Sequence, residues 1–319
     1  MQADKYLAFG LFAFLGAVVA AYAVRLALMG RARFARLDRD GGSALLSVQV
    51  MELGYWVLQP VVNLLHRLGA TPNGVTVFGV VPGVAAAIAA ANGWFALACL
   101  MGMMSAFCDA IDGMLAKRCG GATTGGQALD SILDRVTESA LFCGIALYFH
   151  AAVPLLSLCL LGLMGAYMTS YVSAKADAMG LSLPRGVMRR PERAVYVLFA
   201  CAFTPIWSLW VPADAPVAMR ALPVLAIVGL VGLVANLSAL SRLRALLAML
   251  GTASATAAGM RERRVSTQDL TPLSPKEIMA LATADMRGAA CSSCHTPGKT
   301  LTQLVRSIPR RPCRRPRTS

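Results

Sequence analysis

The sequence has 319 residues, of which 57% are hydrophobic and only 14% are charged, and its formal net charge is +14. A soluble globular domain carries about 25% charged residues, so this composition excludes an ordinary soluble fold and indicates an all-α, polytopic membrane protein. In a membrane protein a basic balance is typical of the positive-inside bias and of attraction to anionic lipids or phosphorylated substrates. We therefore expect the lipid bilayer as a partner and no nucleic acid.

Seven apolar segments follow one another along the chain, each close to the roughly 20 residues that cross the hydrocarbon core. They predict an additional N-terminal span followed by a six-helix bundle, at residues 7–29, 74–92, 94–116, 128–149, 152–174, 194–212 and 221–241. The chain then divides into an extra transmembrane helix with a basic flank, an interfacial helix, a six-span core and a basic tail expected to be disordered, at residues 1–41, 42–72, 73–247 and 248–319.

The first apolar segment has two interpretations. Ala21-Tyr22-Ala23 resembles a signal-peptide cleavage site. However, the basic cluster follows the apolar run, as in a retained helix whose N-terminus lies outside. When the spans alternate from that start, only Lys5 and Arg220 among the basic residues fall outside. This asymmetry supports the span count and an orientation in which the segment after Met29 lies in the cytoplasm. We expect an integral protein of the bacterial cytoplasmic membrane.

Residues 42–70 are expected to form an amphipathic helix at the inner membrane interface. Apolar residues recur there at near-helical spacing, Trp56 is placed to anchor at head-group level, and Pro60 is placed to kink the helix. A small soluble helix packed on the bundle is the alternative.

Four aspartates lie where the third and fourth spans meet the inner membrane surface: Asp109, Asp112, Asp130 and Asp134. A carboxylate within a membrane helix costs a few kcal/mol, and four together also repel one another. The first two are spaced i,i+3 and the last two i,i+4, so each pair shares a helix face, and a glycine-rich turn joins the helices. This pattern favours a site for hard divalent cations, Mg²⁺ or Mn²⁺, with two ions matching the four charges.

The alternative for these aspartates is a proton relay, or pairing with the neighbouring bases Lys117, Arg118 and Arg135. A membrane transporter or ion-conducting protein would also place carboxylates within spans. Such a protein would have acids distributed over several spans, whereas here they are confined to two adjacent helix ends.

The aspartate segment resembles the signature of the CDP-alcohol phosphatidyltransferase family, Asp-x2-Asp-Gly-x2-Ala-Arg-x8-Gly-x3-Asp-x3-Asp. The matching residues are Asp109, Asp112, Gly113, Ala116, Lys117, Gly126, Asp130 and Asp134. Lys117 replaces the usual arginine, which preserves the positive charge but not the bidentate geometry. The six predicted spans from 74 to 241 match the family's six-helix core.

This resemblance implies the transfer of a phosphatidyl group from CDP-diacylglycerol, or a similar CDP-lipid, to the hydroxyl of a small alcohol, with release of CMP. It also implies an active site on the cytoplasmic side, and homodimers are common in the family. By analogy, Asp109, Asp112 and Asp130 hold the metal ions, and Asp134 is the general base and a further metal ligand. Contacts with the CDP-lipid are expected from the glycine, alanine and lysine positions of the signature, which are Gly113, Ala116, Lys117 and Gly126.

Basic residues near the fifth and sixth spans have two interpretations. They are ordinary positive-inside loop charges, or they form a phosphate-binding pocket beside the metal site. The segments Ser170–Lys175 and Arg190–Arg193 resemble the branch of the family that uses phosphorylated acceptors such as inositol phosphate. The expected acceptor-binding residues are Lys175, Arg189, Arg190 and Arg193, with a phosphorylated polyol preferred and glycerol phosphate next.

The basic tail contains Cys291-Ser-Ser-Cys294-His295, which matches the pattern for c-type haem attachment. A zinc site that includes Cys313 and an unstructured tail that binds nothing are the alternatives. The pattern alone does not decide among the three.

Overall fold

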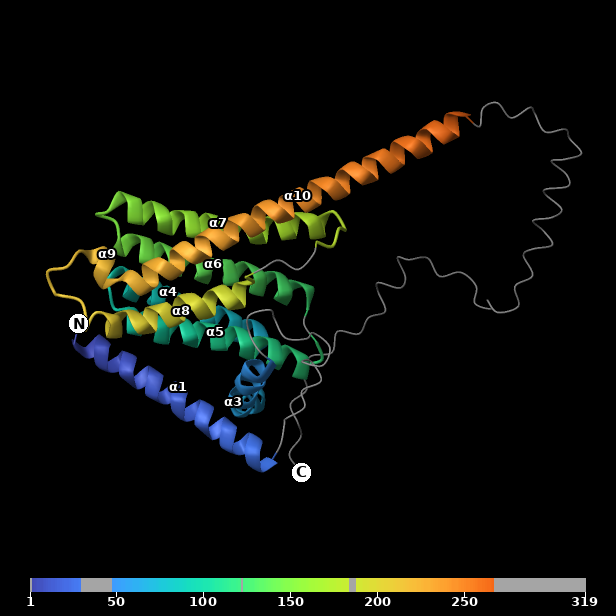
Figure 1. The fold of residues 1–319 in the computed structure, drawn as a ribbon. Helices are drawn as coiled ribbons and strands as arrows, with labels where there is room; N and C mark the ends of the chain where they lie inside the picture. The colour runs from blue at the N-terminus through green and yellow to red at the C-terminus, as the bar shows by residue number, and fades with distance from the viewer. Residues whose placement is uncertain (1, 30–47, 122, 184–187, 267–319) are drawn as a thin grey trace, which may run out of the picture. The chain divides into compact units, whose positions relative to one another are not determined.

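The structure is a computed structural model and describes residues 2–29, 48–121, 123–183 and 188–266. All regular elements in these ranges are helices, which confirms the all-α prediction (Figure 1). In chain order they are α1 (Gln2–Met29), α3 (Val48–Arg67), α4 (Pro72–Ala91), α5 (Phe95–Arg118), α6 (Thr124–Tyr148), α7 (Val153–Ala178), α8 (Arg190–Trp207), α9 (Val217–Arg220) and α10 (Leu222–Ser266).

The chain divides into two units, residues 1–246 and residues 247–319. In the second unit the described residues are helical and end at Ser266. The Cys291-Ser-Ser-Cys294-His295 pattern, the expected disordered tail beyond Ser266 and the basic flank at 30–41 lie outside the described residues. All side-chain contacts and pockets described below lie in the first unit.

Five helices in the described residues are long and apolar enough to cross a membrane. They are Gln2–Leu28, Pro72–Ala91, Phe95–Arg118, Val153–Ala178 and Leu222–Gly251. The two other expected spans, 128–149 and 194–212, largely coincide with α6 and α8. These two helices form at the expected places, but the charged residues in their first halves make them less apolar than the other five.

Local capping chemistry fixes where α4 and α6 begin. The Thr71 Oγ1 atom accepts a hydrogen bond from the Gly74 amide at 3.2 Å, and the Thr123 Oγ1 atom accepts one from the Gly126 amide at 3.0 Å. A threonine side chain at this position satisfies an amide that would otherwise lack a helical partner. The turn before α6 passes through Gly120 and Gly121, whose φ angles of 99° and 116° favour glycine.

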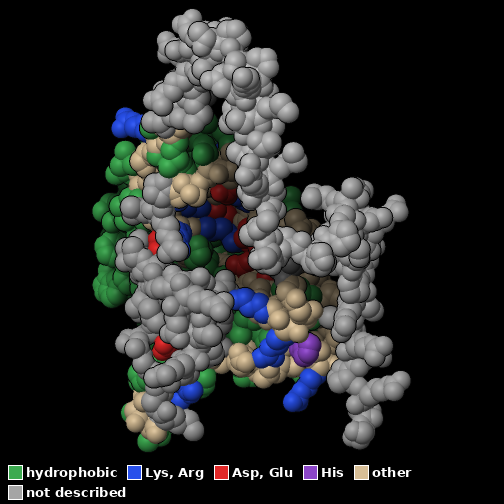
Figure 2. Space-filling view, turned by 90° about the vertical axis from the view of Figure 1, so that its right-hand side faces the viewer, with side chains coloured by type: hydrophobic (Ala, Val, Ile, Leu, Met, Phe, Trp, Pro, Cys, Tyr) green, Lys and Arg blue, Asp and Glu red, His purple; other side chains and the backbone are tan. Residues whose placement is uncertain are grey.

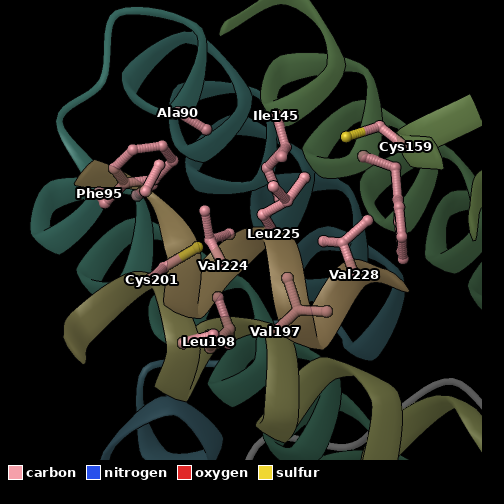
Figure 3. Close-up of a cluster of buried hydrophobic side chains, with 14 of the residues drawn as sticks. Ala90, Phe95, Ile145, Cys159, Val197, Leu198, Cys201, Val224, Leu225 and Val228 are labelled. Carbon is pink, nitrogen blue, oxygen red and sulfur yellow. The ribbon is translucent and has the colours of Figure 1, made fainter. Parts of the chain in front are cut away.

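The core lies among α4, α5, α6, α7, α8 and the first turns of α10. Figure 3 shows Val197 and Leu198 of α8 gathered with Val224 and Val228 of α10, and all four are buried. Small residues let the helices approach closely. A Cβ atom on Gly144 of α6 would lie only 2.2 Å from the Ala87 carbonyl oxygen of α4, so these two backbones are in contact.

Helix α1 is attached to the core at both of its ends. Near its start, the Asp4 carboxylate accepts hydrogen bonds from the Ala96 and Leu97 amides at 3.3 and 3.2 Å. Near its end, the Tyr22 hydroxyl donates to the Glu52 carboxylate of α3 at 3.0 Å. Polar anchors at both ends hold α1 in one position along the bundle.

Helix α3 corresponds to the expected interfacial helix and contains Pro60. Its buried residues Leu58 and Val62 pack in one cluster with Ile111 of α5. Through this contact α3 supports the part of α5 that carries Asp109 and Asp112.

Candidate metal centre and active site

Three of the four predicted aspartates converge where α5 and α6 meet. One carboxylate oxygen from each of Asp109, Asp112 and Asp130 lies within 4.8 Å of the corresponding oxygens of the other two. The i,i+3 spacing on α5 and the short turn into α6 produce this convergence, because they turn both acidic faces toward the same space.

The surroundings of this triad fit a divalent cation. Asp112 is buried and accepts a hydrogen bond from the Thr76 hydroxyl of α4 at 2.5 Å. The Oδ1 atom of Asp130 is buried and has no hydrogen-bond partner among the described residues. A buried carboxylate oxygen without a partner is costly, and hard cations such as Mg²⁺ and Mn²⁺ prefer clustered carboxylate oxygens. The donor set therefore suits the predicted metal ions.

Asp134 lies in the same pocket but is not a member of the triad. Its carboxylate accepts a hydrogen bond from the Arg190 guanidinium of α8, and the same Nη1 atom lies 3.6 Å from the Asp109 carboxylate. The pocket is lined by all four aspartates together with Thr76, Ser105, Thr137 and Arg190. Arg190 thus contacts one acid on each of the two acidic helices.

The remaining signature residues are placed in different ways. Gly113 has open space where a Cβ would stand, and Ala116 is buried. A Cβ on Gly126 would lie 2.9 Å from the Asn73 side-chain oxygen, so glycine permits the close approach of α6 to the start of α4. Lys117 is exposed in the last turn of α5 and does not line the aspartate pocket.

A second, open pocket adjoins the first and is strongly basic. Residues of α6, α7, α8 and α10 line it, and five of them are arginines, namely Arg135, Arg189, Arg190, Arg193 and Arg242. Arg190 lines both pockets. Figure 2 shows acidic and basic side chains adjoining in the hollow of one face of the molecule.

Three of the four expected acceptor-binding residues, Arg189, Arg190 and Arg193, line the basic pocket. The fourth, Lys175, is exposed on α7 and is not among the lining residues. Arg193 is buried and forms a bidentate pair with Glu138, at 2.8 Å from Nε and 3.1 Å from Nη2. This pair ties the first turn of α8 to α6.

Three functional candidates were missed by the sequence reasoning. Glu138 continues the spacing of Asp130 and Asp134 by another four residues, so this acidic stripe was visible in the sequence. Thr76 and Arg242 had no such signal. Arg242 reaches the basic pocket from α10 and donates a hydrogen bond to the Ser173 hydroxyl. In the sequence alone it is one more basic residue after an apolar span.

Comparisons with known proteins identify the family that this chain matches. A family model described as CDP-alcohol phosphatidyltransferase matches residues 69–253. The phosphatidylinositol phosphate synthase of Corynebacterium glutamicum is 34% identical over 172 residues, which cover 52% of this chain and 77% of the relative. The Mycobacterium tuberculosis enzyme of the same name is 34% identical over 163 residues, which cover 49% of this chain and 75% of the relative.

The fold of this chain is also similar to solved structures of an enzyme with the same name as these relatives. The crystal structure of the Mycobacterium tuberculosis phosphatidylinositol phosphate synthase with CDP-DAG bound has a TM-score of 0.51 and 27% identity, and covers 60% of this chain and 94% of that chain. The structure of that enzyme in complex with manganese and citrate has a TM-score of 0.52 and 26% identity, and covers 59% and 88%. The family match includes the four aspartates and the arginines, whereas α1 and α3 lie before it.

Proposed function

This chain belongs to the CDP-alcohol phosphatidyltransferase family, and we propose that its two adjoining pockets transfer a phosphatidyl group from CDP-diacylglycerol to a phosphorylated alcohol. The observation that carries the proposal is the position of three converging carboxylates directly beside a pocket with five arginines. The first set suits a metal-bound diphosphate, and the second suits an acceptor phosphate.

Asp109, Asp112 and Asp130 would hold the metal ions, with Asp134 as a further ligand. Mg²⁺ or Mn²⁺ bound there would neutralise charge on the diphosphate and on the departing CMP. The manganese complex of the relative supports this assignment. The open space at Gly113 supports its proposed contact with the CDP-lipid. Ala116, Lys117 and Gly126 stay in the proposed lipid-binding set on the family resemblance alone.

Asp134 is proposed to be the general base. Its carboxylate accepts the proton of the acceptor hydroxyl, the hydroxyl oxygen forms a bond with the β-phosphorus, and the bond from that phosphorus to CMP breaks. Arg190 supports this role because it contacts Asp134 and lines both pockets. An acceptor phosphate held by the arginines would bring the hydroxyl of the same molecule to Asp134.

The proposed acceptor is inositol phosphate, with glycerol phosphate as the second candidate. The arginine pocket supports a phosphorylated acceptor, and the names of the relatives support inositol phosphate. Arg189, Arg190 and Arg242 are the proposed phosphate ligands. Arg193 stays in the set on the family resemblance, because its buried guanidinium is paired with Glu138. Lys175 stays in the proposed set on the family resemblance alone, because it does not line the pocket.

Release of CMP by the purified protein tests this function. CDP-diacylglycerol and Mn²⁺ are supplied with inositol phosphate, glycerol phosphate, inositol or serine, one at a time. We expect release with inositol phosphate and its loss in Asp134→Asn. Release only with a non-phosphorylated alcohol would reject the arginine pocket as the acceptor site, and no release with any acceptor from folded protein would reject the transfer itself.

This integral membrane protein is proposed to lie in the bacterial cytoplasmic membrane with its aspartates on the cytoplasmic side. The bacterial relatives and the charge asymmetry of the sequence support this orientation. A homodimer is proposed from the family resemblance alone. Labelling of an introduced cysteine with an impermeant reagent on intact cells tests the orientation, and cross-linking in membranes tests the dimer.

A further inference from the structure

A third polar pocket lies at the opposite end of α5 and α6, and the proposed reaction does not use it. Phe95 at the start of α5 and Tyr148 at the end of α6 both line it. At 1.5 Å per residue, these positions lie about 25 Å along the helix axes from Asp112 and Asp130. That separation is close to the roughly 30 Å thickness of a hydrocarbon core, so the two ends of the bundle lie at opposite membrane surfaces.

The extra helix α1 forms one side of this pocket. Asp4 and Lys5 come from α1, whereas the other polar lining residues come from the core: Tyr148, Thr204, Ser208 and Arg220. Because α1 lies before the family match at 69–253, the pocket is complete only in a chain that carries this additional helix.

The charges of this pocket favour an anion. Both carboxylate oxygens of Asp4 are already engaged by the Ala96 and Leu97 amides. The charged residues that line the pocket are therefore two cations, Lys5 and Arg220, and one carboxylate whose oxygens already accept hydrogen bonds. The Nε atom of Arg220 is buried and has no hydrogen-bond partner among the described residues, which is a costly state for a charged donor.

Aromatic residues place this pocket at head-group depth. Trp94 and Trp210 are exposed at the same end of the bundle, and the Trp207 indole donates to the Met219 carbonyl at 2.8 Å beside Arg220. Tryptophans concentrate where the hydrocarbon meets the head groups, and basic pockets between transmembrane helices bind anionic head groups.

We propose that this pocket binds the phosphate of an anionic phospholipid between Lys5 and Arg220, on the leaflet opposite the aspartates. The bound phosphate joins α1 to the core by contacting one cation from each. Anionic lipid therefore strengthens the attachment of α1, independently of the substrate chemistry at the other end. Free inorganic phosphate presents the same chemistry without acyl chains, so the test compares the two sources.

The test is native mass spectrometry of the full chain released from nanodiscs that contain equal amounts of phosphatidylglycerol and phosphatidylcholine. We expect preferential retention of phosphatidylglycerol by the wild type, reduced at least about fivefold in Lys5→Gln/Arg220→Gln, which corresponds to about 1 kcal/mol. Arg67→Gln removes a charge from exposed α3, away from this pocket, and is expected to retain lipid like the wild type. Lipid at the aspartate end contributes equally to the wild type and to the Lys5→Gln/Arg220→Gln variant, so the difference between these two proteins isolates this pocket.

Millimolar inorganic phosphate is added in a second arm. Displacement of the lipid would show that the phosphate group carries the recognition, and lack of displacement would show that the acyl chains are also required. Equal retention of the two lipids by the wild type, or unchanged retention in the double variant, would overturn the proposal. If the double variant does not fold, Lys5→Gln alone decides, because it changes one side chain near the start of α1.

Discussion

The two ends of the helix bundle use the same residue type in opposite ways. At the start of α5, both carboxylate oxygens of Asp4 accept hydrogen bonds from backbone amides of that helix. At the other end, the carboxylates of Asp109, Asp112 and Asp130 converge, and one oxygen of Asp130 has no hydrogen-bond partner within the described part of the chain. A carboxylate with its partners in place stabilises the fold, whereas clustered carboxylates that lack them mark a site that requires a ligand.

The largest expected effect is at the clustered end. Asp130→Asn should lower metal-dependent CMP release by more than about 100-fold. Loss of a residue that only hydrogen-bonds to a metal ligand already lowers metal affinity or activity by about 10–100-fold, and Asp130 is a proposed ligand itself. In metal-free buffer the same change should raise the melting temperature, since it removes repulsion among three carboxylates. Activity assays and thermal unfolding measure the two effects. A melting temperature that falls without metal would contradict the claim that the three carboxylates repel one another.

The basic pocket should show an effect of about 10–100-fold, because a charged hydrogen bond contributes about 1.5–3 kcal/mol. Arg242→Ala should raise the KM for the phosphorylated acceptor by this factor and leave the KM for CDP-diacylglycerol unchanged. The matched control is Arg244→Ala, an exposed arginine two residues further along α10 that does not line the pocket. Equal KM values for the acceptor in the two variants would remove Arg242 from the site.

Thr76 tests the support of the metal centre. Thr76→Val removes the hydroxyl that donates to Asp112 and should weaken Mn²⁺ activation by about 10-fold. Thr76→Ser retains the hydroxyl and should restore activation. Titration of activity with Mn²⁺ compares the three proteins, and a serine variant as weak as the valine variant would indicate a packing role instead.

The smallest expected effect is at the opposite end. Asp4→Ala should lower the free energy of unfolding by about 0.5–2 kcal/mol, the usual cost of losing a helix cap. Asp214→Ala changes an exposed acid in the loop before α9 and should have no such effect. Denaturation in detergent measures both, and equal stability of the two variants would mean that Asp4 does not cap α5.

The sequence predicted the aspartate cluster because its geometry is local. Spacings of three and four residues and a short glycine turn determine which side chains meet, and Glu138 could have been found by extending the same spacing. Arg242 and Thr76 could not be found, because they reach the site only through the packing of α10 and α4. Likewise, the sequence alone shows Asp4 and Lys5 as two opposite charges that cancel. In the structure Asp4 accepts hydrogen bonds from α5, whereas Lys5 lines the third pocket.

The end of the last helix shows a similar limit. The apolar pattern predicts a span that stops at residue 241, whereas α10 continues to Ser266. The additional residues include several alanines, such as Ala253, Ala255 and Ala257, which favour a helix without contributing an apolar face. Hydropathy marks the most apolar part of a helix and not the full length of the helix.

The central claim is that the clustered carboxylates form the metal centre. Its most direct test is a titration of the purified protein with Mn²⁺, in which the loss of the free-ion signal in electron paramagnetic resonance measures binding. We predict that the wild type with CDP-diacylglycerol binds about two ions per chain, that Asp109→Asn and Asp130→Asn lose this binding, and that Asp4→Asn retains it. Equal Mn²⁺ binding by the wild type and the Asp130→Asn protein would contradict the assignment of the clustered carboxylates as the metal centre.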